Sequence, residues 1–178
     1  MRRMMRVVAV AAVLVAASTS GASAQRAFGM GAADIGPVIG LGGIGSAGLS
    51  FGGRFEKAIK ELPNLGDGVL AIQVSADYYS FSNDANFSFR YIPIGVTANY
   101  HIKVNNEKVD PFVGAGLGYL IFSCSSCGSG LSSGSGIYFV GRAGLRYYLA
   151  SGLALYGDVG AGAATLNLGV MFRISGKK

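Results

Sequence analysis

The chain alternates apolar and polar residues over long stretches, which is the pattern of a strand with one apolar and one polar face. Segment 166–173 shows it most clearly, because Leu166, Leu168, Val170 and Phe172 share one face. The other face of such segments is mostly Gly, Ser and a few charged residues. The pattern recurs eight times after the N-terminal segment. It predicts an all-β fold, an eight-stranded antiparallel transmembrane β-barrel.

Turn-forming residues separate the predicted strands. The strands run over about residues 34–41, 48–57, 69–80, 87–103, 110–122, 137–149, 153–160 and 166–174. In the fourth strand the parity of the apolar positions changes at Ile92-Pro93. One extra residue at that point would restore the facing, and Pro is tolerated at a bulge, so we expect a β-bulge there. The segment 58–68 is long for a turn on the side of the barrel that is taken below as periplasmic, where turns are usually short.

The first residues have the features of a secretory signal. Basic residues at positions 2, 3 and 6 precede an apolar stretch over 7–17, and Ala22-Ser23-Ala24 supplies small residues at the expected cleavage site. We therefore predict a short signal helix over residues 1–24, cleavage between Ala24 and Gln25, and a barrel domain over 25–178. Beyond this segment there is no run of about 18 apolar residues, so no transmembrane helix is predicted.

Composition decides between a membrane barrel and a soluble barrel such as a lipocalin, which also alternates. Apolar residues make up 51% of the chain and charged residues only 13%. A soluble barrel needs many Lys and Glu on its outer face, whereas a narrow lumen needs few charges. The apolar faces are therefore expected to meet lipid. The formal charge of +6 falls to +3 once the three signal arginines are removed, so it does not argue for nucleic acid.

A small set of charged residues falls on the inward faces of the predicted strands. Buried charges must be paired, so we expect a salt-bridge network that closes the lumen. A selectivity lining for a conduit is the alternative. The residues are Arg54, Glu56, Asp77, Arg142, Arg146, Asp158 and Arg173.

An even number of strands places both termini on one side, taken as the periplasm. The outward aromatic residues then form two girdles, one at each rim of the membrane. The periplasmic girdle consists of Phe55, Tyr100, Tyr147 and Phe172, and the outer one of Tyr78, Phe87, Phe89 and Phe139.

Cys124 and Cys127 and the single histidine, His101, are the residues with candidate chemistry. A zinc site normally needs about four ligands, which these residues do not supply. Export favours oxidation, so we predict a structural Cys124–Cys127 disulfide, in preference to a redox pair or free thiols. His101 is expected to face inward near the periplasmic rim, which argues against an outer-leaflet enzyme. No catalytic residue, metal or cofactor is predicted.

Three segments resemble the small outer-membrane barrel superfamily of the OmpA/OmpX type. They are Val109 to Tyr119, Ile92 to Tyr100, and the last strand. That strand is similar to the C-terminal assembly signal of this class, with Asn167, Gly169, Phe172 and Ile174 at the usual spacing.

The resemblance implies a protein of the outer membrane that contacts membrane lipids and lipopolysaccharide and depends on the outer-membrane assembly machinery. Barrels of this class serve as anchors, adhesins, small-solute conduits or, rarely, lipid-modifying enzymes. We expect a monomer without enzymatic activity, whose lumen is packed and whose role is structural or surface interaction through the outer loops. A narrow porin-like conduit for small or apolar solutes is the alternative.

Overall fold

The computed structural model describes residues 28–43, 48–82, 88–125 and 134–176. The predicted signal segment and its cleavage site lie outside these residues and stay predictions. Among the described residues, no helix is long and apolar enough to cross a membrane.

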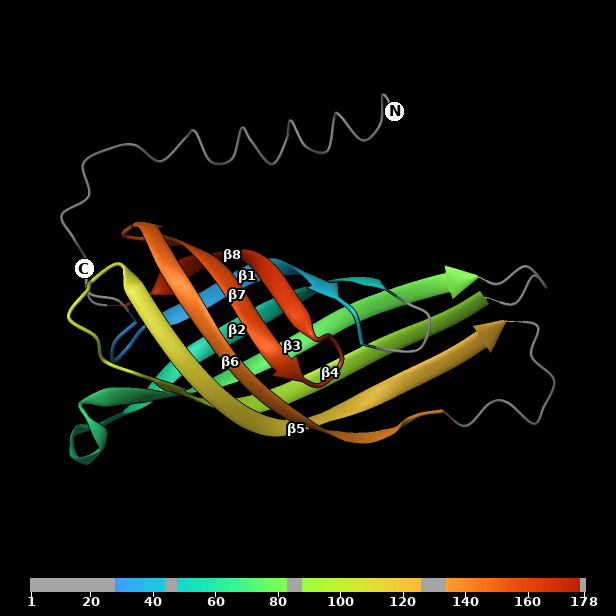
Figure 1. Cartoon of the computed structure of the whole chain (residues 1–178), viewed down its shortest axis with the longest axis horizontal. Coiled ribbons are helices and arrows are strands. Elements are labelled where there is room, and N and C mark those ends of the chain that lie inside the picture. Colours follow the sequence, from blue (N-terminus) through green and yellow to red (C-terminus); the bar gives the residue numbers. More distant parts are fainter. Residues whose placement is uncertain (1–27, 44–47, 83–87, 126–133, 177–178) are drawn as a thin grey trace, which may run out of the picture.

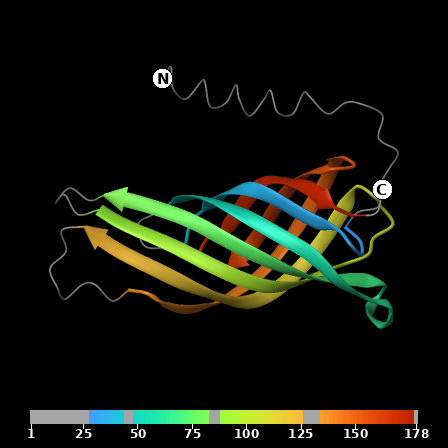
Figure 2. The same cartoon turned by 180° about the vertical axis from the view of Figure 1, so that it is seen from behind.

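Eight strands form one closed antiparallel barrel in which each strand pairs with its neighbours in sequence and β1 pairs with β8 (Figures 1 and 2). The predicted fold is therefore confirmed. The strands are β1 (Ala33–Leu41), β2 (Leu49–Leu62), β3 (Gly68–Ser82), β4 (Ser88–His101), β5 (Val109–Ser125), β6 (Gly136–Ala150), β7 (Leu153–Ala161) and β8 (Leu166–Ser175).

The alternation along each strand separates the barrel exterior from its interior. In β8, Leu168 and Phe172 are exposed on the outside, whereas Asn167 and Met171 are buried inside. Large apolar side chains are exposed in the same way on all eight strands. An exterior of this kind is the lipid-facing surface of a membrane-spanning barrel.

The long segment after the predicted second strand is mostly strand. β2 continues to Leu62, with a register irregularity between Ala58 and Lys60. A 3₁₀ turn over Pro63–Leu65 follows, and Gly66 and Asp67 then adopt positive φ values of 72° and 55°. These left-handed residues reverse the chain, so the hairpin ends in a short turn.

The bulge predicted at Ile92-Pro93 is absent, and that prediction is wrong. Ala76 pairs with Ile94 and Tyr79 with Tyr91, so the register of β3 on β4 is the same on both sides of Pro93. The ladder to β3 leaves out Ile92 and Pro93, as expected where proline has no N–H to donate. The parity change therefore places the aromatic side chains of Phe89 and Tyr91, which precede Pro93 in the chain, on the inward face.

The outer aromatic girdle is corrected accordingly. Phe89 lies on the inward face, where its ring stacks on Phe81 at 5.0 Å and lies 6.3 Å from Phe122. Tyr78 and Phe139 do face outward and are exposed. Phe87 lies outside the described residues.

One wall of the barrel is longer than the other. The outer ends of β3 to β6 extend past the turn that joins β7 to β8 (Figures 1 and 2). Pairing between β6 and β7 begins only at Gly141 and Ala161, so residues 136–140 of β6 pair with β5 alone. The barrel rim is therefore stepped beside β6.

Candidate functional site: the charged lumen

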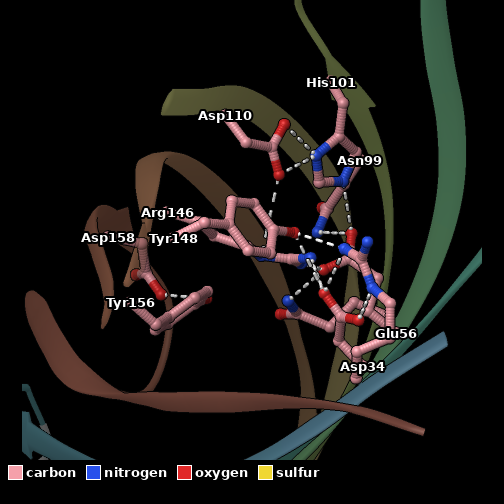
Figure 3. Close-up of polar contacts among 11 residues, drawn as sticks. Asp34, Glu56, Asn99, His101, Asp110, Arg146, Tyr148, Tyr156 and Asp158 are labelled. Carbon is pink, nitrogen blue, oxygen red and sulfur yellow. Dashed lines mark hydrogen bonds and ion pairs between the residues drawn. The ribbon is translucent and has the colours of Figure 1, made fainter. Parts of the chain in front are cut away.

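The densest group of polar side chains lies inside the barrel, toward the end at which β1 begins and β8 ends, which we take as the periplasmic end. Glu56 of β2 contacts four of these side chains (Figure 3). Glu56 is fully buried. Its carboxylate accepts hydrogen bonds from Gln73 at 2.9 Å and Asn99 at 2.8 Å, and a charged one from Arg146. Charge-assisted hydrogen bonds are the strong ones, so Glu56 joins strands β2, β3, β4 and β6 across the lumen.

His101 lies between two carboxylates. Its Nε2 is 2.8 Å from Oε1 of Glu56, and its Nδ1 is 2.8 Å from Oδ1 of Asp110. A neutral imidazole has only one N–H, so only the imidazolium form donates to both carboxylates at once. In that form His101 supplies a positive charge to the cluster.

Asp34, at the start of β1, holds the other side of this layer. It accepts hydrogen bonds from Arg146 at 2.9 Å and from the Nε of Arg173 at 2.8 Å. The hydroxyl of Tyr148 donates to it at 3.2 Å. Three acidic side chains, Asp34, Glu56 and Asp110, thus face Arg146, Arg173 and His101 in one layer.

A second layer lies closer to the outer end. Arg54 bonds to Asp77 at 2.9 Å and to the amide oxygen of Asn167 at 3.1 Å. Arg142 forms an ion pair with Asp158. Asp158 also accepts from Asn167 at 2.9 Å, so Asn167 connects the two ion pairs. The hydroxyl of Tyr156 completes the shell of Asp158 at 2.5 Å.

An aromatic ring closes the lumen at its periplasmic end. Phe28, just ahead of β1, is buried and stacks on His101 with ring centroids 4.2 Å apart. The Arg146 guanidinium lies 4.7 Å from the Phe28 ring and 5.7 Å from the Phe112 ring. A cation over an aromatic face is stabilised, so the Phe28 ring both covers Arg146 and stabilises its charge.

A tyrosine closes the outer end. Tyr79 of β3 is fully buried, and its hydroxyl donates to the carbonyl of Ala163 at 2.5 Å, across the lumen. Arg142 reaches the next carbonyl, that of Ala164, at 3.1 Å. These two bonds tie the β7–β8 turn to the interior of the barrel.

The structure brings all the inward charges named from the sequence into these two layers. Arg54, Asp77, Arg142 and Asp158 lie in the outer one, and Glu56, Arg146 and Arg173 in the periplasmic one. Asp34 and Asp110 are not among the inward charges predicted from the sequence, which also predicts no partner for His101. Strand parity alone could have identified all three, since each falls on the inward face of its strand.

Among the described residues, no nucleophile contacts the ring of His101. Both ring nitrogens face carboxylates, and no Ser, Thr or Cys among the described residues hydrogen-bonds to the ring. No group of His, Cys, Asp and Glu in the described part of the chain could hold a metal ion. Cys127 lies outside the described residues, so the Cys124–Cys127 disulfide stays a prediction.

Comparison with known proteins gives a structural relationship only. No family model and no curated protein matches the sequence. Among solved structures, a de novo designed transmembrane β-barrel is 17% identical with a TM-score of 0.53, and the match covers 83% of this chain and 99% of that one.

Two natural barrels are similar to the same degree. Ail of Yersinia pestis in a phospholipid nanodisc is 16% identical with a TM-score of 0.51, over 81% of this chain and 99% of that one. Neisserial surface protein A is 20% identical with a TM-score of 0.51, over 88% of this chain and all of that one. By its fold and its apolar exterior, the chain is a small eight-stranded transmembrane β-barrel, similar in fold to these proteins.

Proposed function

We propose that the protein is a sealed outer-membrane barrel with a structural or surface-interaction role, and that it is neither a conduit nor an enzyme. The observation that carries this proposal is the filled lumen. Two layers of ion pairs occupy its middle, Phe28 covers one end, and Tyr79 crosses the other. A solute would have to displace these side chains to pass.

The energetics of the ionic layers support a permanent seal. Breaking one side of a buried ion pair typically costs about 3–5 kcal/mol, because a charge is left unpaired. Opening a path through either layer would separate several such pairs at once. An eight-stranded barrel also has an interior just wide enough for its own side chains.

The periplasmic pocket does not favour the conduit alternative. A cavity of about 520 Å³ opens at that end, lined by Phe28, Lys103, Asn106, Glu107 and others, and by His101 and Asp110 at its inner limit. His101 and Asp110 are themselves bonded members of the periplasmic layer. The pocket is therefore a vestibule that ends at the ionic layer.

The absence of a nucleophile beside His101 in the described residues supports a non-enzymatic role. With the lumen sealed, the protein can act only through its surfaces. We propose that it works as a monomer in contact with membrane lipids and lipopolysaccharide, presents its outer loops at the cell surface, and does not bind nucleic acid.

Solute flux tests this proposal. Refolded protein in vesicles should admit small sugars and amino acids no faster than protein-free vesicles, as measured by osmotic swelling. Folding in the same vesicles is checked by the slower migration of the unheated barrel in detergent gels. Rapid swelling with fully folded protein would instead establish the conduit.

A further inference from the structure

The stepped rim beside β6 leaves part of a strand without a neighbour. Residues 136–140 of β6 pair with β5 on one side, and no described strand lies on their other side. Ile137 and Phe139 project outward there and are 75% and 82% exposed. Leu117, which pairs with Phe139, is only 51% exposed, because it has strands on both sides.

A notch lies at this step. It is a cavity of about 320 Å³ between β6 and the β7–β8 turn, lined by Leu120, Ile137, Tyr138, Phe139, Gly162 and Ala163. Ile137 and Phe139 belong to the outer face of the barrel, whereas Leu120 and Tyr138 belong to its inner face. The notch therefore runs from the lipid-facing surface around the edge of β6 toward the interior.

The outer mouth of the notch is continuous with the membrane-facing surface. Val96, Leu117 and Phe139 are paired in register across β4, β5 and β6 and form one exposed apolar row that ends at the notch. The next row, Ile94, Tyr119 and Ile137, ends there too. The lipid that covers these two rows of side chains therefore also reaches the notch.

The chemistry of the lining selects an apolar occupant. The lining side chains are apolar apart from the Tyr138 hydroxyl, because Leu120, Ile137, Phe139 and Ala163 carry no polar group. The open edge of β6, in contrast, presents backbone N–H and C=O groups, which are costly to leave unpaired against hydrocarbon. A molecule with an apolar chain and a polar head matches both features.

We propose that this notch is a lipid-binding site, which takes an acyl chain of a lipid from the surrounding bilayer and places its polar head against the edge of β6. Lipid is the occupant because the notch continues the lipid-facing surface. The proposal goes beyond the role of the barrel as a whole and does not depend on whether the lumen conducts.

The chain has no tryptophan, so one introduced tryptophan reports on its own surroundings. Gly136 borders the notch, and a Cβ added to it meets nothing within 4 Å, so the side chain of Gly136→Trp begins in open space beside the notch. Gly141→Trp, also unobstructed, puts the same side chain on the outer face of the same strand. Phe28→Trp places it at the other end of the lumen, beside His101 and away from the notch.

The three variants are refolded into vesicles of phosphatidylcholine with brominated acyl chains, which quench indole on contact. We expect Gly136→Trp to lose a fraction of its fluorescence comparable to Gly141→Trp, while Phe28→Trp keeps most of its emission. Quenching of Gly136→Trp no greater than that of Phe28→Trp would overturn the proposal. So would quenching by aqueous iodide in place of brominated chains, because water would then fill the notch.

Discussion

At the scale of single residues, the lumen depends on a few groups with several partners each. Glu56 receives hydrogen bonds from a glutamine, an asparagine, the histidine and an arginine. Removing a buried charge that has this many partners exposes each partner to an uncompensated desolvation cost. Such residues should be far less tolerant of substitution than equally charged residues on the surface.

Glu56→Gln tests this difference, since it keeps the size of the side chain and removes its charge. Arg146 and His101 then lose a counter-charge inside the barrel, and we expect a loss in unfolding free energy of about 3–5 kcal/mol. Glu61→Gln, on the exposed end of β2, is the matched control and should change it by less than about 0.5 kcal/mol. Urea unfolding in detergent micelles measures both variants, and equal midpoints would contradict the account of the lumen.

Strand parity predicts which residues enter the lumen but not which of them meet. Arg146 and Asp34 lie on β6 and β1, and they pair across the interior of the barrel. That contact depends on the register at which β1 pairs with β8. The alternation within a single strand carries no information about this register. The pattern also does not predict that Phe28 covers the lumen, because Phe28 lies ahead of the first strand, where no alternation shows which way a side chain points.

At the scale of elements, the closing seam between β1 and β8 allows very little space. A Cβ on Gly36 would lie 1.7 Å from the carbonyl oxygen of Val170 in β8, which is backbone and cannot rotate away.

The β3–β4 ladder is the element in which the sequence predicts a bulge, at Pro93, and the strand instead stays in register. Alternation located the strands, but a parity change alone could not distinguish a bulge from aromatic side chains turned inward.

Gly36→Ala should therefore weaken the seam. Overpacking typically costs about 1–3 kcal/mol, and here β8 backbone must move, so we expect the upper part of that range or failure to fold. Gly141→Ala adds the same methyl group to open space and should leave the urea midpoint unchanged. If both variants unfold at the same urea concentration, β1 and β8 are not packed as closely as described.

At the scale of the whole molecule, the barrel combines an apolar exterior with an interior in which acidic and basic side chains pair in two layers. The exterior and the number of strands could be predicted from alternation and from the scarcity of charged residues. The stepped rim could not, because it depends on where each hairpin turns relative to its neighbours. The central claim about the molecule is that its lumen is sealed.

Single-channel recording across a planar lipid bilayer tests that claim most directly. Wild-type protein, shown to be folded by its heat-dependent migration in detergent gels, should leave the bilayer current at its baseline, without steady steps. Large and stable conductance steps that scale with the number of inserted barrels would show a hydrated pore through the ionic layers and would contradict the sealed lumen.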